Sequence, residues 1–242
     1  MNQCIHTYKY LGSLLCALML TGICITNTFA TNDISQPKDE EQAIMQGNVR
    51  ELQERPLDPP LHASVPSNYS LQFNSKNFER KTTQVNGETI FYRAFTNIPY
   101  VANPIDVKYQ SMNIYIPEAY FKGQKINGYT SKTAPIFFPN SIGGYMPSTA
   151  ASVEPSGPHA QETKLTAVQY ALSKGYVVAA PATRGRTRAN TSGAYIGKAP
   201  AAIVDLQAAV AYLHCNDKRM PGDADKIISD GTSAGGALSL LL

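Results

Sequence analysis

The sequence lacks tryptophan and is poor in cysteine and in net charge. None of its 242 residues is tryptophan, and the aromatic side chains are 14 tyrosines and 8 phenylalanines. The 21 basic and 18 acidic residues give a net charge of only +3 and form no basic cluster. This balance excludes an electrostatic nucleic-acid surface, so no nucleic-acid partner is expected. The sequence has no His/Cys/carboxylate group at metal-ligand spacing, so neither a metal nor a cofactor is expected.

Cysteine is scarcer still beyond the N-terminal segment. Three of the four cysteines precede residue 31, and only Cys215 remains after it. One cysteine cannot close an internal disulfide, so we expect the mature domain to be held together by core packing. Cys215 follows an apolar helix pattern, and we expect a small buried side chain rather than a catalytic group.

The N-terminal segment, residues 1–30, has the organisation of a secretory signal peptide. Lys9 is its only charged residue, and the apolar run Leu11–Ile25 follows. Ala30 provides the small residue that signal peptidase requires at a cleavage site. A membrane-spanning helix needs about 20 apolar residues, and Ile23 is too large for the lipobox of a lipoprotein. We therefore expect cleavage after Ala30, a secreted or periplasmic protein and no stable membrane anchor.

Composition and periodicity divide the remainder into two parts. Residues 31–64 are polar, acidic and proline-bearing, and we expect a lead-in with a short helix near Glu41–Leu52. Residues 65–242 carry the patterns of a folded domain. Within them, Glu88–Phe95 and Gln110–Ile116 place apolar residues at every second position, which predicts half-buried antiparallel strands.

Strands and helices alternate from residue 134 onward. The predicted strands are Ala134–Pro139, Tyr176–Ala180 and Lys226–Asp230, and the predicted helices are Thr163–Ser173, Pro200–His214 and one that begins after Gly231. The first helix has Leu165 on its apolar stripe and ends at the C-cap Gly175. Alternation with short links implies right-handed crossovers and a parallel sheet. Antiparallel strands leading into such a run predict the α/β class and the sheet of an α/β-hydrolase.

The segment Gly231–Gly235 reads GTSAG and fits the pattern G-x-S-x-G between a strand expected to be buried and an apolar helix. This context predicts a nucleophile elbow with Ser233 as the nucleophile. The outer glycines leave room for neighbouring backbone, and the turn directs the serine hydroxyl out of the sheet. The amide of Ala234, at the helix N-terminus, can then stabilise an oxyanion. A phosphate-binding loop would need Lys followed by Ser or Thr, which this segment lacks.

A second oxyanion donor is expected from the loop after an early buried strand. That loop contains the paired glycines Gly143 and Gly144, whose amides can turn inward; a plain glycine turn is the alternative. Arg184 and Arg186 follow a strand end on the side where ligands bind in such sheets. They either contribute to substrate binding or form a buried ion pair that fixes their loop.

A longer stretch of the sequence resembles a known family. The block Tyr195–Tyr212 reads YIGKAPAAIVDLQAAVAY and resembles bacterial tannases of subtype B, and more broadly the secreted feruloyl-esterase-like branch of the fold. The stretches Pro139–Met146, Arg184–Arg186 and Ile228–Ser239 are similar to the same family. The similarity runs from about residue 113 to residue 242.

The resemblance implies a chemistry and assigns residues to it. It implies hydrolysis of esters of aromatic acids, such as galloyl esters, with a small-molecule ester as substrate. Ser233 would be the nucleophile, and Ala234 with Gly143 or Gly144 would be the oxyanion donors. The elbow and the block agree in indicating a serine esterase.

The sequence supplies no base for that serine. A serine nucleophile needs one, and in α/β-hydrolases the acid and the histidine follow the serine. None of the residues after Ser233 is Asp, Glu or His. His6, His62, His159 and His214 all precede it, and we expect none of them to be the catalytic base. We therefore expect a fragment that is incomplete at the C-terminal side of the sheet, inactive alone and prone to aggregation.

Three functions are compatible with these observations. The first is a secreted hydrolase of aromatic esters. The second is a non-catalytic secreted protein that keeps the fold as a binding module, which the intact elbow opposes. The third is a serine peptidase, or a feruloyl or acetyl esterase, of the same fold. The sequence does not determine the oligomeric state.

Overall fold

The structure is a computed structural model, and it describes residues 68–155 and 165–242. The predicted signal peptide, the lead-in with its short helix, His62 and His159 lie outside the described residues. The described elements are β1 (Glu79–Val85), β2 (Glu88–Pro99), β3 (Ser111–Pro117), the 3-10 helix η2 (Glu118–Lys122), β4 (Pro135–Pro139), α3 (Ala167–Ser173), β5 (Val177–Pro181), α4 (Ala201–Asn216), β6 (Asp223–Asp230) and α5 (Ala234–Ser239). No described helix is long and apolar enough to cross a membrane.

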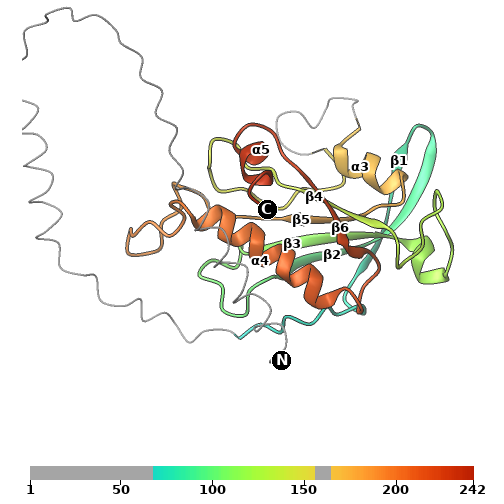
Figure 1. Cartoon of the computed structure of the whole chain (residues 1–242), viewed down its shortest axis with the longest axis horizontal. Coiled ribbons are helices and arrows are strands. Elements are labelled where there is room, and N and C mark those ends of the chain that lie inside the picture. Colours follow the sequence, from blue (N-terminus) through green and yellow to red (C-terminus); the bar gives the residue numbers. More distant parts are fainter. Residues whose placement is uncertain (1–67, 156–164) are drawn as a thin grey trace, which may run out of the picture. The chain divides into compact units, whose positions relative to one another are not determined.

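The six described strands form one mixed sheet in the order β1-β2-β3-β5-β4-β6 (Figure 1). Pairing is antiparallel from β1 through β3 to β5, whereas β4 pairs in parallel with both β5 and β6. The predicted antiparallel entry and parallel continuation are confirmed. Because β4, β5 and β6 are parallel, their carboxyl ends meet at one edge of the sheet, which we call the carboxyl edge.

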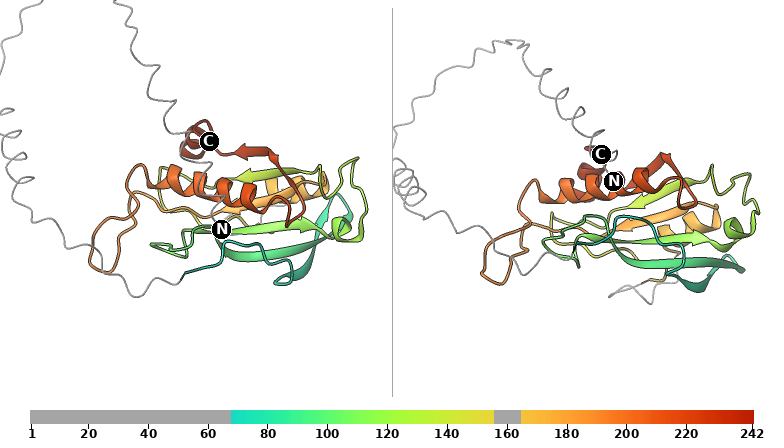
Figure 2. Two further views of the ribbon diagram at one scale, coloured as in Figure 1. Left: turned by 60° about the horizontal axis from the view of Figure 1, so that its bottom comes forward. Right: turned by 90° about the horizontal axis from the view of Figure 1, so that it is seen from below.

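Helices cover both faces of this sheet (Figure 2). On one face α4 and α5 pack in the main core, where Leu206 and Leu213 are fully buried against strand residues such as Phe138. On the other face α3 packs through Leu172 against Val178 of β5. Burying each such side chain contributes about 1.5–3 kcal/mol. Strands between two helical layers explain the continuous apolar runs of β4 and β5.

Two local predictions are wrong. The strand β6 was expected to be buried, but only Ala224 of its eight residues is, because among the described strands only β4 pairs with it. The helix α3 begins later than its apolar pattern suggests, at the N-cap Thr166, whose hydroxyl accepts a hydrogen bond from the amide of Gln169 at 3.0 Å. Leu165 therefore precedes the helix and is exposed. Gly175, with a φ of 83°, follows the helix end as predicted.

Cys215 also departs from its prediction. It is exposed on α4 rather than buried. The buried face of α4 includes Leu206 and Leu213. A position two residues beyond Leu213 is rotated by about 200° in a helix with 3.6 residues per turn. The apolar pattern of this helix therefore extends to Cys215 in the sequence but not on its buried face.

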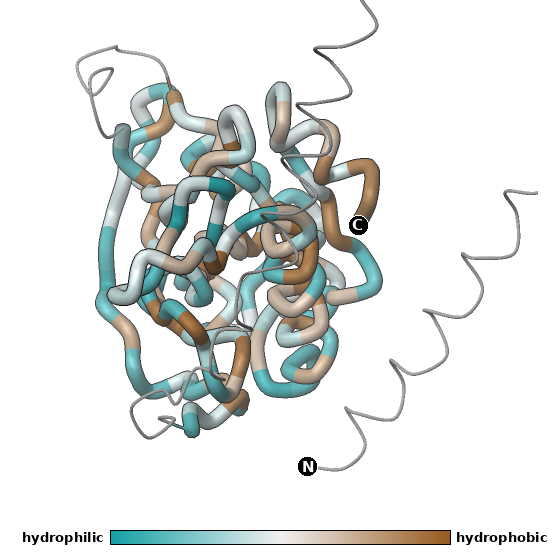
Figure 3. The backbone as a smooth tube through the Cα atoms, turned by 90° about the vertical axis from the view of Figure 1, so that its left-hand side faces the viewer, coloured by the Kyte–Doolittle hydropathy of each residue, from teal (hydrophilic) through white to brown (hydrophobic). Residues whose placement is uncertain are grey.

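The chain beyond α5 is apolar (Figure 3), and its side chains are exposed. Leu240 is 89% exposed and Leu241 is 63% exposed. The helix α5 ends at Ser239, so these leucines follow it. Contiguous exposed apolar surface of this kind promotes association.

A partly buried ion pair joins β2 to η2 at the sheet edge opposite the carboxyl edge. Arg93 donates from Nε and Nη2 to the Glu118 carboxylate at 2.7 and 3.0 Å. The guanidinium lies between two rings, with Cζ 4.2 Å from the centroid of Phe78 and 3.7 Å from that of Phe121. Its hydrogen bonds hold the pKa of Glu118 below the ordinary value.

We predict that Glu118→Gln lowers the free energy of unfolding by about 2 kcal/mol at pH 7, because a charge-assisted hydrogen bond is lost. The folded-state pKa of Glu118 lies below its unfolded value, so this contribution is present above the unfolded pKa. It disappears as the pH falls through the folded pKa. Urea unfolding at pH 7 and pH 3 measures the difference.

Glu79→Gln is the matched control, because the Glu79–Lys81 pair is 2.9 Å long but its side chains are 67% and 48% exposed. Such surface pairs contribute little. An equal loss of stability in the Glu118 variant at both pH values would contradict the prediction.

Candidate active site

Ser233 lies in the turn between β6 and α5, at the carboxyl edge. Its φ of 56° and ψ of −119° fall in a sparsely populated region for a residue with a side chain. Such a conformation costs on the order of 1–3 kcal/mol and persists only where the surroundings enforce it. The helix α5 begins at the next residue, Ala234. The strand–turn–helix context that the sequence motif requires is therefore present.

Close backbone packing enforces this turn. A Cβ on Gly231 would lie 2.5 Å from the carbonyl carbon of Gly235, and a Cβ on Gly235 would lie 2.5 Å from Asn140 Oδ1. Asn140 donates from Nδ2 to the carbonyl of Gly235 at 3.1 Å and to Ser239 Oγ at 2.9 Å. Its own amide donates to the carbonyl of Asp230 at 2.8 Å. The Asn140 side chain thus attaches the elbow to the end of β4.

The loop that follows β4 lies directly against the elbow. The amide of Gly235 donates to the carbonyl of Ile142 at 2.9 Å, one residue before Gly143. Gly144 and Tyr145 have positive φ values of 56° and 58°, which turn this loop sharply. The loop containing the two predicted oxyanion glycines is therefore held by a hydrogen bond to the turn that contains Ser233. We call residues 141–148 the glycine loop.

A cavity of about 750 Å³ opens at this edge. Ser233 and Gly143 both line it, together with residues 147–152, 154 and 155 and the start of α3. Ala234 and Gly144 are not part of its lining; Ala234 is buried beneath the turn. The structure thus brings Ser233 and one of the predicted glycines to a common space.

The candidate bases are absent from the described lining of this cavity. His214, the one histidine within residues 68–155 and 165–242, lies on α4 with its side chain 48% exposed, and its Nδ1 is 4.0 Å from the Asp225 carboxylate. It does not line the cavity. The same described residues contain no group of three metal-ligating side chains.

Arg184 is held in a buried ion pair rather than facing the cavity. Its Nη2 lies 2.7 Å from Asp205 Oδ1, its Nε donates to Oδ2 at 3.0 Å, and its Nη1 donates to the carbonyl of Ile196 at 3.0 Å. This arrangement corresponds to the ion-pair alternative. The exposed Arg186 does not line the cavity either, but its amide donates to the carbonyl of Tyr145 at 2.8 Å.

Sequence reasoning missed two residues of this region. Asp205 is fully buried on α4, and its signal was a single carboxylate within an otherwise apolar helix pattern. Such a residue is rarely buried without a partner, so it predicts an ion pair. Asn140, whose side chain attaches the elbow to β4, had no comparable signal, because a polar residue is common in any loop that follows a strand.

A strained serine between strand and helix, at the carboxyl edge of a mixed sheet with this strand order, defines an α/β-hydrolase. Residues 156–242 match the BD-FAE family model. The crystal structure of the Fusobacterium nucleatum tannase is similar, with a TM-score of 0.68 and 60% sequence identity over 72% of this chain and 35% of that one. No curated protein matches the chain significantly.

Other solved tannases agree. A tannase from Lactobacillus plantarum has a TM-score of 0.66 and 42% identity, over 71% of this chain and 36% of that one. A tannin acyl hydrolase in complex with ethyl gallate has a TM-score of 0.65 and 43% identity, over 71% of this chain and 37% of that one. The chain belongs to the tannase and feruloyl-esterase-like family of α/β-hydrolases. It spans 35% to 37% of the length of these relatives.

We predict that Gly235→Ala destabilises the protein by about 1–3 kcal/mol, because the added methyl would overlap the Asn140 side chain, which cannot move without disturbing its hydrogen bonds to Gly235 and Ser239. Denaturant unfolding measures the change. Gly143→Ala is the control, since a Cβ there would meet no atom within 4 Å. Equal unfolding midpoints for the two variants would show that the packing around the elbow is looser than described.

We also predict that Ser233→Gly is more stable than Ser233→Ala by about 1 kcal/mol. Glycine adopts positive φ without a steric penalty, whereas alanine keeps the Cβ that makes this backbone unfavourable. Thermal unfolding of the two variants tests the strain directly and does not depend on activity. A less stable glycine variant would argue against a strained turn.

Proposed function

We propose that this chain provides the nucleophile and the oxyanion donors of a secreted serine ester hydrolase for galloyl-type aromatic esters. The supporting observation is the strained backbone of Ser233 beside a cavity that Gly143 also lines. Strain of this kind persists where mechanism uses it, because exposing the hydroxyl at a sharp turn is what nucleophilic attack needs. A protein that only binds its ligand gains nothing from it.

In the proposed mechanism, Ser233 Oγ attacks the carbonyl carbon of the ester. The amide of Ala234 and that of Gly143 or Gly144 donate to the oxyanion of the tetrahedral intermediate. Collapse of this intermediate breaks the bond to the alcohol, which leaves with the proton taken from the serine. Water then hydrolyses the acyl-enzyme and releases the aromatic acid.

In this mechanism the catalytic acid and base come from outside the described residues. No histidine is among the described residues that line the cavity, and serine is a weak nucleophile without one. The described part therefore supplies the elbow, the glycine loop and one wall of the cavity. Export follows from the predicted signal peptide at residues 1–30.

The ligands of two similar proteins support the proposed substrate class. One similar tannin acyl hydrolase is in complex with ethyl gallate, and another is in complex with 3,4-dihydroxybenzoate. In both ligands a carboxyl carbon is attached to an aromatic ring, and this ring carries hydroxyl groups on adjacent carbons. The cavity of about 750 Å³ lies within the range of small-molecule sites.

Comparing the hydrolysis of methyl gallate with that of methyl ferulate separates galloyl from feruloyl specificity, and a panel of peptide substrates tests peptidase activity.

A chimera tests the nucleophile. Residues 68–242 replace the matching segment of the Fusobacterium nucleatum tannase, which is 60% identical. We expect this chimera to hydrolyse methyl gallate, and Ser233→Ala to lower kcat by about 10⁶-fold, as for other serine hydrolases. Steady-state kinetics and acyl-enzyme trapping by mass spectrometry measure both effects.

Ser173→Ala is the matched control, because Ser173 Oγ only donates to the carbonyl of Tyr170 at the end of α3. It should leave kcat and KM unchanged. A folded chimera that retains turnover after Ser233→Ala would refute the nucleophile assignment. A folded but inactive chimera would show that this chain does not carry a functional elbow.

A further inference from the structure

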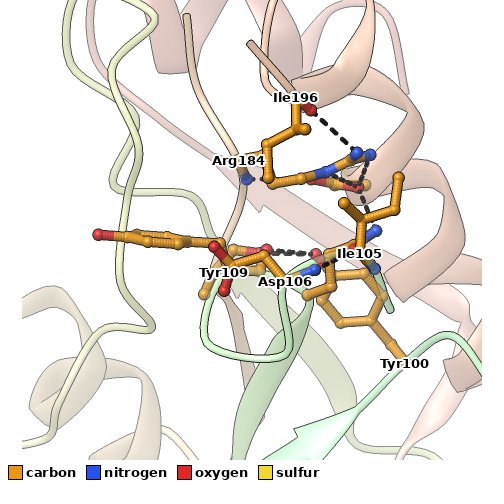
Figure 4. Close-up of polar contacts among 9 residues, drawn as sticks. Tyr100, Ile105, Asp106, Tyr109, Arg184 and Ile196 are labelled. Carbon is orange, nitrogen blue, oxygen red and sulfur yellow. Dashed lines mark hydrogen bonds and ion pairs between the residues drawn. The ribbon is translucent and has the colours of Figure 1, made fainter. Parts of the chain in front are cut away.

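Arg184 lies at the centre of a buried polar network (Figure 4), where it forms an ion pair with Asp205. The two side chains are 8% and 0% exposed. Besides the guanidinium, the backbone amide of Arg184 donates to Asp205 Oδ2 at 3.0 Å, and Gln110 Nε2 donates to Oδ1 at 3.0 Å. The carboxylate thus accepts from the side chain and the backbone of the same arginine, which fixes the start of the segment after β5.

The same network fixes the connection between β2 and β3 at the carboxyl edge. Gln110 Oε1 accepts from the amides of Ile105 and Asp106 at 2.6 and 3.1 Å. The Tyr100 hydroxyl donates to the carbonyl of Ala182 at 2.8 Å, just before the arginine segment. Burial, followed by the nearby Asp205 carboxylate, raises the pKa of Tyr100 above its ordinary value, so this hydroxyl stays protonated and remains a donor.

The other side of the arginine segment lies against the glycine loop. Thr183 and Ser148 exchange two backbone hydrogen bonds of 2.9 and 3.0 Å. The amide of Arg186 donates to the carbonyl of Tyr145. Between them, Gly185 packs so closely that a Cβ there would overlap the backbone of Met146. Residues 183–186 therefore contact the glycine loop on both sides of Arg184.

We propose that the Arg184–Asp205 pair positions the glycine loop. Through residues 183–186 the pair sets where the amides of Gly143 and Gly144 lie relative to Ser233. This inference rests on the proposed function. The glycine loop has no regular structure, and two successive residues in it have positive φ. Oxyanion donors must be placed to within a fraction of an ångström to act. A rigid external support is therefore required, and the residues after β5 provide it.

The chemistry of the pair fits positioning better than ligand binding. All three guanidinium nitrogens of Arg184 have hydrogen-bond partners within the protein. A buried ion pair contributes little net stability compared with apolar packing, because desolvation offsets the attraction. Its hydrogen-bond directions, however, define one geometry. Arg184 and Asp205 are thus positioning residues that act through the loop and do not touch substrate.

Arg184→Lys in the full chain tests the positioning directly. Lysine keeps the charge but cannot reproduce the forked contacts with Asp205. We expect amide hydrogen exchange in the peptides covering residues 141–149 and 182–190 to accelerate by at least about tenfold, with β3 and β4 unchanged. Asp205→Asn, which removes the charge and keeps the shape, should accelerate the same peptides.

Arg93→Lys is the matched control, because Arg93 makes the same kind of two-point contact with Glu118 at the opposite edge. It should leave exchange in the glycine loop at the wild-type rate. If Arg184→Lys and Asp205→Asn also leave the loop at that rate, the positioning proposal is wrong, whatever the activity. If one variant does not fold, the other decides.

Kinetics in the chimera add a readout that a merely structural pair would not change. We expect Arg184→Lys to lower kcat for methyl gallate by about 10- to 100-fold with KM nearly unchanged, because a displaced oxyanion donor weakens the transition state. Arg93→Lys should change neither constant. Equal kcat in the two variants would overturn the proposal. Absence of turnover in the unmodified chimera would count against the proposed function, and the exchange experiment would still decide the positioning.

Discussion

Backbone atoms around Ser233 lie so close together that side chains do not fit at positions 231 and 235. This crowding comes from the end of β4 and the first turn of α5, which meet across the Asn140 amide. The serine keeps its positive φ because every neighbouring segment is fixed by a hydrogen bond to another. Without the pairing of β4 with β6, Asn140 would lose its contact with Asp230, and the turn would have no reason to stay strained.

Loops at the carboxyl edge are held by polar groups that are themselves buried. The glycine loop hydrogen-bonds to the elbow on one side and to residues 183–186 on the other. Those residues are anchored in turn by Asp205 of α4, which packs in the main core together with α5. Irregular backbone needs such external partners, because it cannot satisfy its own amides and carbonyls. The helix α4 therefore links the main core to the loops of the site. It contributes Leu206 to the core and Asp205 to the network that holds the loops.

Periodicity and local motifs predicted most of the fold. The buried runs of β4 and β5 and the elbow were readable because each depends on residues adjacent in the sequence. The hairpin of β1 and β2 was missed, although Asn86–Gly87, with φ of 50° and 84°, is a recognised signal for a two-residue turn. The exposure of β6 and of Cys215 was not predictable, because it depends on which elements pack beside them.

The burial of Asp205 and the contacts of Asn140 with the elbow could not be predicted from the sequence, for a related reason. Each residue acts through a partner distant along the chain, Arg184 in one case and Gly235 in the other. A motif describes neighbours, whereas these contacts arise only when the sheet brings separate loops together. The elbow itself could be predicted, but not what holds it.

The Asn86–Gly87 hairpin lies at the sheet end opposite the cavity, and a Cβ on Gly87 would meet no atom within 4 Å. An insertion there would extend into solvent without crossing the core. A fluorophore or a surface tether attached at this turn would leave the carboxyl edge facing the solution. Attachment through the Asn86–Gly87 turn would therefore orient the protein on a sensor chip or another solid support with its cavity accessible.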